Sequence, residues 1–173
     1  MSKKVKATKS IELVAKSGVD TGIKASARAK LAEKLGTVLA SNYTLTLKTQ
    51  NYHWHVTGAN FISLHEMFGE HYTVLSAATD ELAERVRALG HFAPATFREF
   101  GKLSFVKEDA TAPATAEAMV GNLLVDHEAM ARECREVKTT AEDAGDDVTT
   151  DMMVERCAYH EKTAWMLRAT LGK

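Results

Sequence analysis

Proline and cysteine are nearly absent from this chain of 173 residues. Its two prolines, Pro94 and Pro113, both fall between residues 90 and 115, so the long stretches on either side lack the residue that breaks helices. Its two cysteines, Cys134 and Cys157, are too few for a disulfide framework and do not form a Cys-x-x-Cys pair. These absences predict unusually long helices and reduced cysteines.

Long apolar runs are also missing. No stretch of about 18 apolar residues occurs, which predicts that nothing spans a membrane. The first ten residues, MSKKVKATKS, lack the apolar core of a secretory signal. The overall composition, 45% hydrophobic, is that of a soluble domain with a full core. We therefore expect a single-domain cytoplasmic protein.

The small net charge of −1 conceals an asymmetry. Residues 1–30 hold eight basic and two acidic residues, a charge of +6, which leaves −7 on the other residues. We interpret residues 1–22 as a flexible lysine-rich tail that binds DNA as a basic arm. The alternative is a terminus that only increases solubility. The lysines assigned to DNA binding are Lys3, Lys4, Lys6 and Lys9.

Apolar residues that recur every three or four positions predict four amphipathic helices and no strand in the domain of residues 23–173. The helices are expected at about 26–56, 60–90, 115–144 and from 149 or 150 to 171. The long connection at 91–114 holds both prolines and has room for a short helix at 96–100. The predicted fold is all-α: a four-helix bundle with a short extra helix in the crossover between helices two and three.

The end of the first helix and the length of the second carry a candidate metal site. His53 and His65, together with Asp80 and Glu84, have the imidazole and carboxylate groups that suit iron or zinc. Asp80 lies about 22 Å beyond His65 along one helix, because each residue adds about 1.5 Å. One chain therefore cannot bring all four side chains to one ion, whereas two copies related by a twofold axis would form two such sites.

Each of these residues also has an ordinary explanation. Glu84 is suited to an ion pair with a neighbouring arginine. His65 is suited to a helix position where its ring makes ordinary hydrogen bonds and binds no metal. A di-iron centre inside one bundle needs Glu-x-x-His motifs on two helices. None of the seven histidines has a glutamate three positions before it, so a centre of that type is not expected.

The stretch from Tyr43 to Gly90 resembles the Dps-type mini-ferritins, the bacterial DNA-binding proteins of starved cells. The matching segments are LKTQNYHWHVTGANF, LHEMF and DELAERVRALG, with HEKTAWMLR near the C-terminus. The resemblance implies a ferritin-like bundle, a dodecamer built from twofold dimers, and ferroxidase sites at the dimer interfaces. It places His53, His65, Asp80 and Glu84 at the iron ligands, which are also the catalytic residues, and Trp54 beside them.

The resemblance also implies a function. Such a protein oxidises Fe(II), preferentially with hydrogen peroxide, stores the ferric oxide in its shell, and protects DNA from oxidative damage during stress and starvation. The cofactor would be iron, with zinc as an alternative occupant of the same residues. DNA, bound without sequence specificity in the bacterial nucleoid, would be a further partner. Trp54 would quench stray oxidising equivalents or serve as a core aromatic.

One position departs from the family pattern. A carboxylate usually follows the second histidine by four residues, but Gly69 stands there. Glu70, His160 or water would replace it; Glu70 points about 140° away from His65 on a regular helix. The alternative function is therefore a DNA-binding, nucleoid-compacting shell whose iron chemistry is weak or altered.

Acidic residues cluster where the third helix gives way to the fourth. Asp146, Asp147 and Asp151 best match the family's pore acids and would concentrate cations at a threefold opening. The alternative is a solvated loop that caps the last helix, and Asp146 or Asp147 suits both roles.

Overall fold

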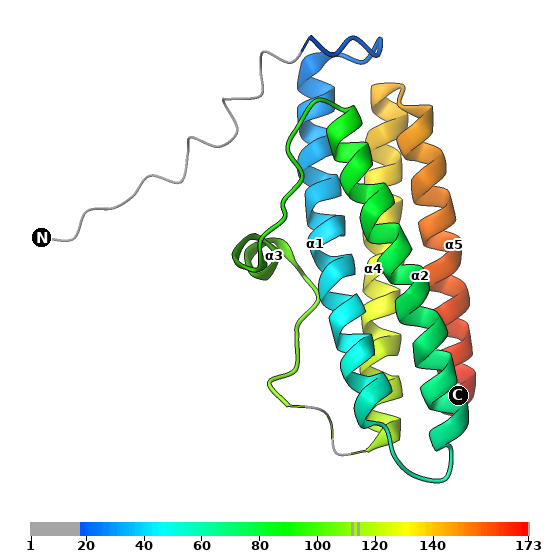
Figure 1. Ribbon diagram of the computed structural model, residues 1–173. Helices are drawn as coiled ribbons and strands as arrows, with labels where there is room; N and C mark the ends of the chain where they lie inside the picture. Colours follow the sequence, from blue (N-terminus) through cyan, green and yellow to red (C-terminus); the bar gives the residue numbers. More distant parts are fainter. Residues whose placement is uncertain (1–17, 112, 114, 173) are drawn as a thin grey trace, which may run out of the picture.

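The protein is a bundle of four long helices with one short helix outside it (Figure 1). The computed structural model describes residues 18–111, 113 and 115–172, and it contains no strand within them. The helices are α1 (Ala25–His55), α2 (Phe61–Ala88), α3 (Phe97–Leu103), α4 (Ala116–Ala144) and α5 (Asp147–Thr170). The all-α bundle with a crossover helix is thus confirmed. The four lysines assigned to the tail lie outside the described residues.

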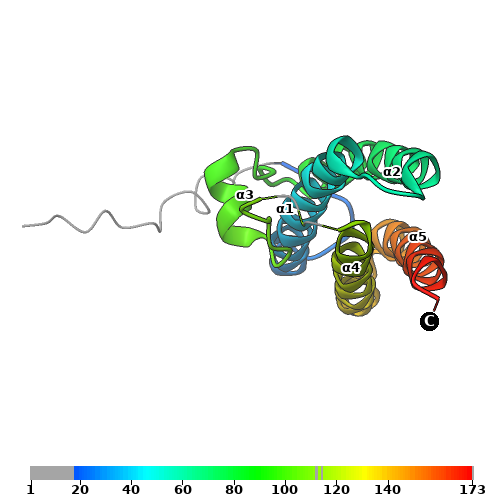
Figure 2. The ribbon, with the colours of Figure 1, turned by 90° about the horizontal axis from the view of Figure 1, so that it is seen from below.

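The long helices form two hairpins that pack against each other. α1 and α2 make one pair and α4 and α5 the other, with α1 beside α4 (Figure 2). The crossover after α2 returns along the bundle, and α3 within it packs on the outer side of α1 (Figure 2). In the described part of the chain, no helix is both long enough and apolar enough to cross a membrane. This arrangement leaves one broad face of the α1–α2 pair open.

Local side chains determine where the helices begin. The hydroxyl of Thr115 accepts a hydrogen bond from the Ala118 backbone at the start of α4, as the sequence suggests. α5 begins two or three residues earlier than expected, because its capping residue is Asp146 and not one of the following threonines. Asn60 precedes α2 but its side chain makes no capping hydrogen bond. The crossover helix continues to Leu103, beyond the expected end at residue 100.

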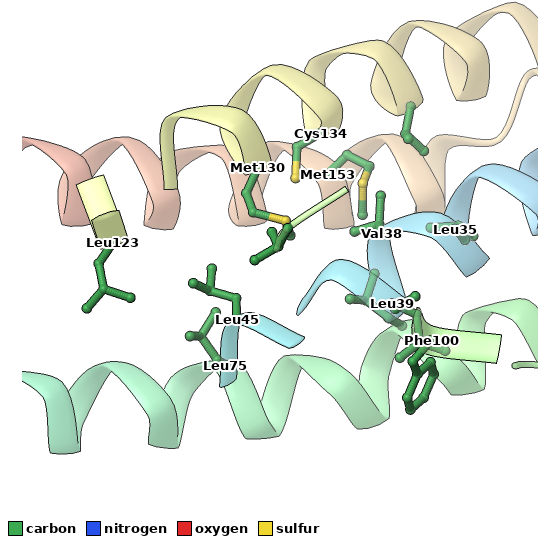
Figure 3. Packing of buried hydrophobic residues seen from close by; sticks show 14 of the residues in the cluster. Leu35, Val38, Leu39, Leu45, Leu75, Phe100, Leu123, Met130, Cys134 and Met153 are labelled. Carbon is green, nitrogen blue, oxygen red and sulfur yellow. The ribbon is translucent and has the colours of Figure 1, made fainter. Parts of the chain in front are cut away.

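Aliphatic and sulfur-containing side chains fill the space between the two hairpins (Figure 3). Each fully buried side chain of this kind stabilises the fold by about 1.5–3 kcal/mol relative to exposure. Four come from α1, one from α2, three from α4 and one from α5: Leu35, Val38, Leu39, Leu45, Leu75, Leu123, Met130, Cys134 and Met153. The core therefore couples all four long helices and fixes the ends of α1 and α2 relative to each other.

Candidate metal centre

His53 and His65 lie face to face where the end of α1 meets the beginning of α2. Their ring centroids are 3.7 Å apart, and the ring planes differ by 18°. Because α1 and α2 are consecutive helices of one hairpin, residues twelve positions apart in sequence reach the same level of the bundle. The structure thus brings together the two histidines that the sequence singled out.

The backbone of each histidine holds the ring of the other. His53 Nδ1 lies 2.7 Å from the carbonyl oxygen of His65, and His65 Nδ1 lies 2.8 Å from the carbonyl oxygen of His53. A carbonyl oxygen only accepts hydrogen bonds, so both Nδ1 atoms donate, and the tautomer that this selects has its lone pair on Nε2 in each ring. Metal-ligating histidines are oriented in this way, with the far nitrogen donating to a backbone carbonyl or a carboxylate.

Two aromatic rings border the histidine pair. The ring of Tyr72 meets His53 edge-on with centroids 5.2 Å apart, and Phe61 lies 5.2 Å from His65. Both histidines are half-buried. The aromatic neighbours therefore restrict ring rotation while one side of the pair remains accessible.

Asp80 and Glu84 lie farther along α2, one helical turn apart, and both are exposed. Asp80 lines a groove of about 380 Å³ between α1 and α2, together with Tyr43, Leu47 and other residues. Within the described residues, no three His, Cys, Asp or Glu side chains are placed to hold one metal ion. Within a single chain, the histidine pair and the two carboxylates thus lie apart from each other.

The ordinary explanation offered for Glu84 would use a neighbouring arginine. Arg85 follows it directly, but the guanidinium of Arg85 pairs with Asp146, with Nη2 2.6 Å from Oδ1. Arg156 approaches α2 at Glu81, where the nitrogen-to-oxygen distance is 3.9 Å. Arg85 and Arg156 thus contact other carboxylates, and Arg87 contacts the His91 carbonyl oxygen and the Phe92 ring.

Gly69 faces the histidine pair directly. A Cβ atom at this position would lie 3.3 Å from Cε1 and 3.5 Å from Nδ1 of His53. Glu70 is exposed beside it and lines an open recess on the outside of α2. The absence of a side chain at residue 69 therefore gives the His53 ring its space.

His160, one of the residues considered as a substitute ligand, belongs to a different cluster. It is 1% exposed, and its Nδ1 lies 2.9 Å from Nδ1 of His127 in the middle of the bundle. His71 on α2 completes this cluster, with its ring centroid 6.0 Å from that of His127. His160 thus does not lie beside the His53–His65 pair.

Burial keeps these three core histidines uncharged. It lowers the pKa of His71 to about 4, and burial with the nearby Arg156 lowers the pKa of His160 to about 3. Burial and the two neighbouring imidazoles lower the pKa of His127 well below its ordinary value. His71 Nδ1 and His127 Nε2 are buried without a hydrogen-bond partner. Sequence reasoning missed this cluster, because its members come from three different helices.

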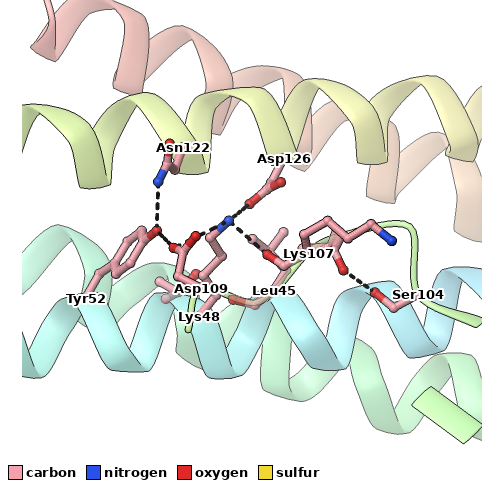
Figure 4. A network of polar contacts seen from close by, with 10 residues as sticks. Leu45, Lys48, Tyr52, Ser104, Lys107, Asp109, Asn122 and Asp126 are labelled. Carbon is pink, nitrogen blue, oxygen red and sulfur yellow. Dashed lines mark hydrogen bonds and ion pairs between the residues drawn. The ribbon is translucent and has the colours of Figure 1, made fainter. Parts of the chain in front are cut away.

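A polar network attaches the crossover to the end of α1 (Figure 4). The buried ammonium of Lys48 lies 2.8 Å from Asp126 on α4 and 3.1 Å from the carbonyl oxygen of Lys107. The Tyr52 hydroxyl donates to Asp109 and accepts a hydrogen bond of 3.1 Å from Asn122. Because Tyr52 directly precedes His53, this network also fixes the turn of α1 that carries the first histidine.

The acidic residues assigned to a pore have different environments. Asp146 is 2% exposed, accepts hydrogen bonds from the Thr149 backbone and hydroxyl, and pairs with Arg85. Burial opposes ionisation, but the bonds from Arg85 and Thr149 hold the pKa of Asp146 below its ordinary value. Asp147 and Asp151 are exposed. Asp146 is therefore a capping residue with a compensated charge, and only the other two present free carboxylates to solvent.

Trp54 is 63% exposed and lines a cavity of about 540 Å³ with Tyr43, Phe97 and other residues of α1 and the crossover. It is therefore not a core aromatic. Leu47 of α1 is 44% exposed and Phe97 of α3 is 78% exposed, so large apolar side chains lie exposed on α1 and on the crossover helix beside it. Such a concentration is characteristic of an interaction surface.

The fold and the sequence define the class of protein. Residues 32–173 match the ferritin-like domain family. The fold is similar to the crystal structure of the DPS protein from Vibrio cholerae O1, described as a member of a superfamily of ferritin-like diiron-carboxylate proteins. The TM-score is 0.85 at 29% identity, covering 90% of this chain and 98% of that one. The protein is thus ferritin-like.

Sequence relatives identify the family within this class. The chain is 37% identical to DNA protection during starvation protein 2 of Bacillus anthracis, over 83% of this chain and 98% of that protein. It is 34% identical to the DNA protection during starvation protein of Helicobacter pylori J99, over 83% and 99%. Dps from Staphylococcus aureus has a similar structure, with a TM-score of 0.79 at 35% identity, covering 82% of this chain and 94% of that one. The chain belongs to the Dps family of mini-ferritins.

Proposed function

We propose that this protein sequesters iron and oxidises Fe²⁺ at sites shared between two copies of the chain. The observation that carries the proposal is the His53–His65 pair, whose mutual hydrogen bonds leave two Nε2 lone pairs free. Two imidazoles are a partial ligand set for Fe²⁺, which also takes carboxylates. Asp80 and Glu84 of a second copy supply these carboxylates.

The open face of the α1–α2 pair supports this pairing of two copies. Leu47 and Trp54 of α1 are large apolar side chains exposed there, as is Phe97 of the neighbouring α3, and their burial would stabilise an interface. A twofold dimer uses the same surface of both chains, so each His53–His65 pair that meets a partner's carboxylates is matched by a second site. This geometry explains why one chain holds only half of each site.

The residues have distinct roles in the oxidation. His53 and His65 bind Fe²⁺ through Nε2, and the carboxylates of Asp80 and Glu84 stabilise the higher charge of Fe³⁺. Two Fe²⁺ ions each lose one electron, and hydrogen peroxide accepts both as its O–O bond breaks, giving two Fe³⁺ and two hydroxide ions. Consuming Fe²⁺ and peroxide together removes both reactants of hydroxyl-radical formation.

The shell stores the product. Twelve chains, assembled from six dimers, enclose a cavity in which ferric oxide accumulates. Asp147 and Asp151 attract the incoming cations at an opening of the shell, because exposed carboxylates create a negative potential there. Zn²⁺, which takes the same ligand types, competes with Fe²⁺ at the shared sites.

Protection of DNA is the second part of the proposal. Two of the relatives carry this activity in their names. The +6 charge of residues 1–30 supports attachment to DNA, because twelve basic segments on one shell act together. A shell that only compacts DNA, with weak iron chemistry, is the alternative.

A complementation experiment tests the shared site. One chain carries His53→Ala and His65→Ala, the other carries Asp80→Ala and Glu84→Ala, and stopped-flow measurements follow Fe²⁺ oxidation by hydrogen peroxide. Each variant shell alone should be inactive. Shells co-assembled from equal amounts should recover about one quarter of the wild-type rate, because about half of the dimers are mixed and each has one intact site. Co-assembled shells as inactive as their parents would contradict the proposal.

A further inference from the structure

Three histidines meet inside the bundle, in a cluster that contains neither member of the His53–His65 pair. His71 comes from α2, His127 from α4 and His160 from α5, and each is 5% exposed or less. The ring centroid of His127 lies 6.0 Å from that of His71 and 5.0 Å from that of His160. Buried polar groups normally have partners, so nitrogens in this cluster that lack one require an explanation.

His127 is held by its neighbour in the orientation of a metal ligand. Its Nδ1 lies 2.9 Å from Nδ1 of His160, and one proton lies between the two nitrogens. When His127 donates this proton, its Nε2 carries a lone pair. That nitrogen is buried and has no hydrogen-bond partner in the described part of the chain. Metal-ligating histidines donate their other ring N–H in the same way, which fixes the ring.

His71 supplies a second nitrogen. Its Nδ1 is also buried and without a hydrogen-bond partner among the described residues. Burial lowers the pKa of His71 to about 4, so the ring is neutral near pH 7 and one of its nitrogens carries a lone pair. An ion in line between two ring nitrogens, about 2 Å from each, places the ring centroids about 6 Å apart. The separation of His71 and His127 matches this value.

The number and type of ligands select the ion. Within the described residues, no third His, Cys, Asp or Glu side chain is placed to share an ion with these two. Zn²⁺ takes four ligands in structural sites, and Fe²⁺ takes carboxylates beside imidazoles, so neither ion fits. Imidazole also suits copper, and the closed-shell Cu⁺ ion is stable with two nitrogen ligands in line.

The charge around the cluster also favours a monovalent ion. Burying one charge costs far less than burying two, because the hydration energy of an ion grows with the square of its charge. Arg156 adds a positive charge nearby: after burial, it is the second cause that lowers the pKa of His160. Both effects oppose a divalent ion.

We propose that His71 Nδ1 and His127 Nε2 bind one Cu⁺ ion inside each chain, with His160 as the positioning residue that holds the His127 ring. This site differs from the proposed ferroxidase site in its residues and in its ion. Two nitrogens cannot supply the square-planar ligand set that Cu²⁺ prefers. The bound copper therefore remains Cu⁺ and does not reduce hydrogen peroxide.

Cu⁺ itself is the probe. The reference protein is the assembled full chain with His53→Ala, His65→Ala and Cys157→Ser, which removes other accessible copper ligands. Cu⁺ is supplied without oxygen from a competing chelator until binding is complete, because an ion reaches buried rings slowly. X-ray absorption should show two nitrogen neighbours and the intense edge feature of two-coordinate Cu⁺. After hydrogen peroxide is added, electron paramagnetic resonance should show no Cu²⁺.

We expect the reference protein to bind about one Cu⁺ per chain. His71→Leu and His127→Leu, each added to it, should abolish this binding, because each removes one of only two ligands. His55→Leu is the matched control, since His55 is an exposed histidine of α1, and it should leave binding unchanged. Circular dichroism shows whether each variant is folded, and the absorption spectrum of the reference protein tests the site without either leucine variant.

His160 is tested by its conservative variant. His160→Gln keeps an acceptor for the His127 N–H and should retain more Cu⁺ affinity than His160→Leu. Equal affinities would overturn the positioning role. Sulfur neighbours in the absorption spectrum, no Cu⁺ binding by the reference protein, or undiminished binding in the His71 and His127 variants would overturn the site. These outcomes leave the proposed function untouched, because the reference protein lacks the His53–His65 pair.

Discussion

His127 and His160 face each other across the middle of the bundle, with their Nδ1 atoms 2.9 Å apart. One Nδ1 must donate and the other accept, so a single proton lies between these two nitrogens. The His71 ring lies 6.0 Å from that of His127, centroid to centroid, and its buried Nδ1 has no hydrogen-bond partner. The core thus contains three imidazoles that are stable together only when uncharged.

Acid should therefore destabilise the bundle through this cluster. The pKa of His71 is lowered to about 4 in the folded protein, whereas an unfolded histidine titrates near 6.5. Between these values the unfolded chain binds more protons, so stability falls as the pH is lowered from about 6.5 to about 4. Each such histidine contributes a slope of about 1.4 kcal/mol per pH unit.

His71→Gln tests this dependence. The variant removes one titrating group, so its free energy of unfolding, measured by urea denaturation at pH values between 4 and 6.5, should vary less steeply than that of wild type. An unchanged slope would show that His71 does not contribute to the acid sensitivity.

Lys48→Met should be strongly destabilising. The change removes the ammonium from a partly buried carboxylate, Asp126. Partial burial already raises the pKa of Asp126 above its ordinary value despite the ammonium beside it. Breaking a buried pair in this way costs about 3–5 kcal/mol. Urea denaturation should show this loss, and Asp126→Leu added to Lys48→Met should restore much of it.

Lys138→Met is the matched control for this experiment. Lys138 pairs with Glu142 one turn along α4, and both side chains are largely accessible to water. Such pairs contribute about 0.5 kcal/mol or less. Equal losses for the two lysine variants would contradict the structural role assigned to Lys48.

Neighbouring aspartates should differ in their effects on iron loading and stability. Asp147→Asn with Asp151→Asn should slow uptake of Fe²⁺ at low concentration, because both carboxylates are exposed and attract cations. Asp146→Asn should leave uptake unchanged but lower the free energy of unfolding by at least about 1 kcal/mol, since it weakens a cap and a buried ion pair. Slower uptake in the Asp146 variant alone would reverse these assignments.

Deletion of residues 2–16 should weaken DNA binding at low salt. The segment contains five of the eight basic residues among the first thirty, Lys3, Lys4, Lys6, Lys9 and Lys16, and phosphate contacts dominate nonspecific affinity. Gel shifts at increasing salt should show a shallower salt dependence for the deletion. A full-length chain in which these lysines are replaced by glutamine should behave like the deletion. Undiminished binding by both proteins would exclude the segment as the DNA contact.

The helix pattern and the ligand spacing were predictable from the sequence because both depend on local periodicity. His53 and His65 meet because a short loop joins two long helices, which the glycine at residue 58 already indicated. Their mutual hydrogen bonds were not predictable, because they depend on the depth and rotation of both helices in the hairpin.

Long-range partners account for what the sequence could not determine. Asp146 and Asp147 are adjacent, yet one is buried and one exposed, because Arg85, far away in the sequence, contacts only the first. The core histidines likewise have ordinary positions on three separate helices, and only the packing of the bundle brings them together. The Gly69 contact with His53 depends on packing in the same way.

The mutual carbonyl bonds of His53 and His65 have a consequence for the isolated chain. Two of the proposed ligands are oriented before any second copy arrives, whereas the carboxylates come only with that copy. We therefore expect iron affinity to depend on protein concentration, because a dilute, unpaired subunit should bind Fe²⁺ weakly and oxidise little of it. Ferroxidase activity per chain should decline on dilution, and newly synthesised subunits should oxidise little iron until they pair.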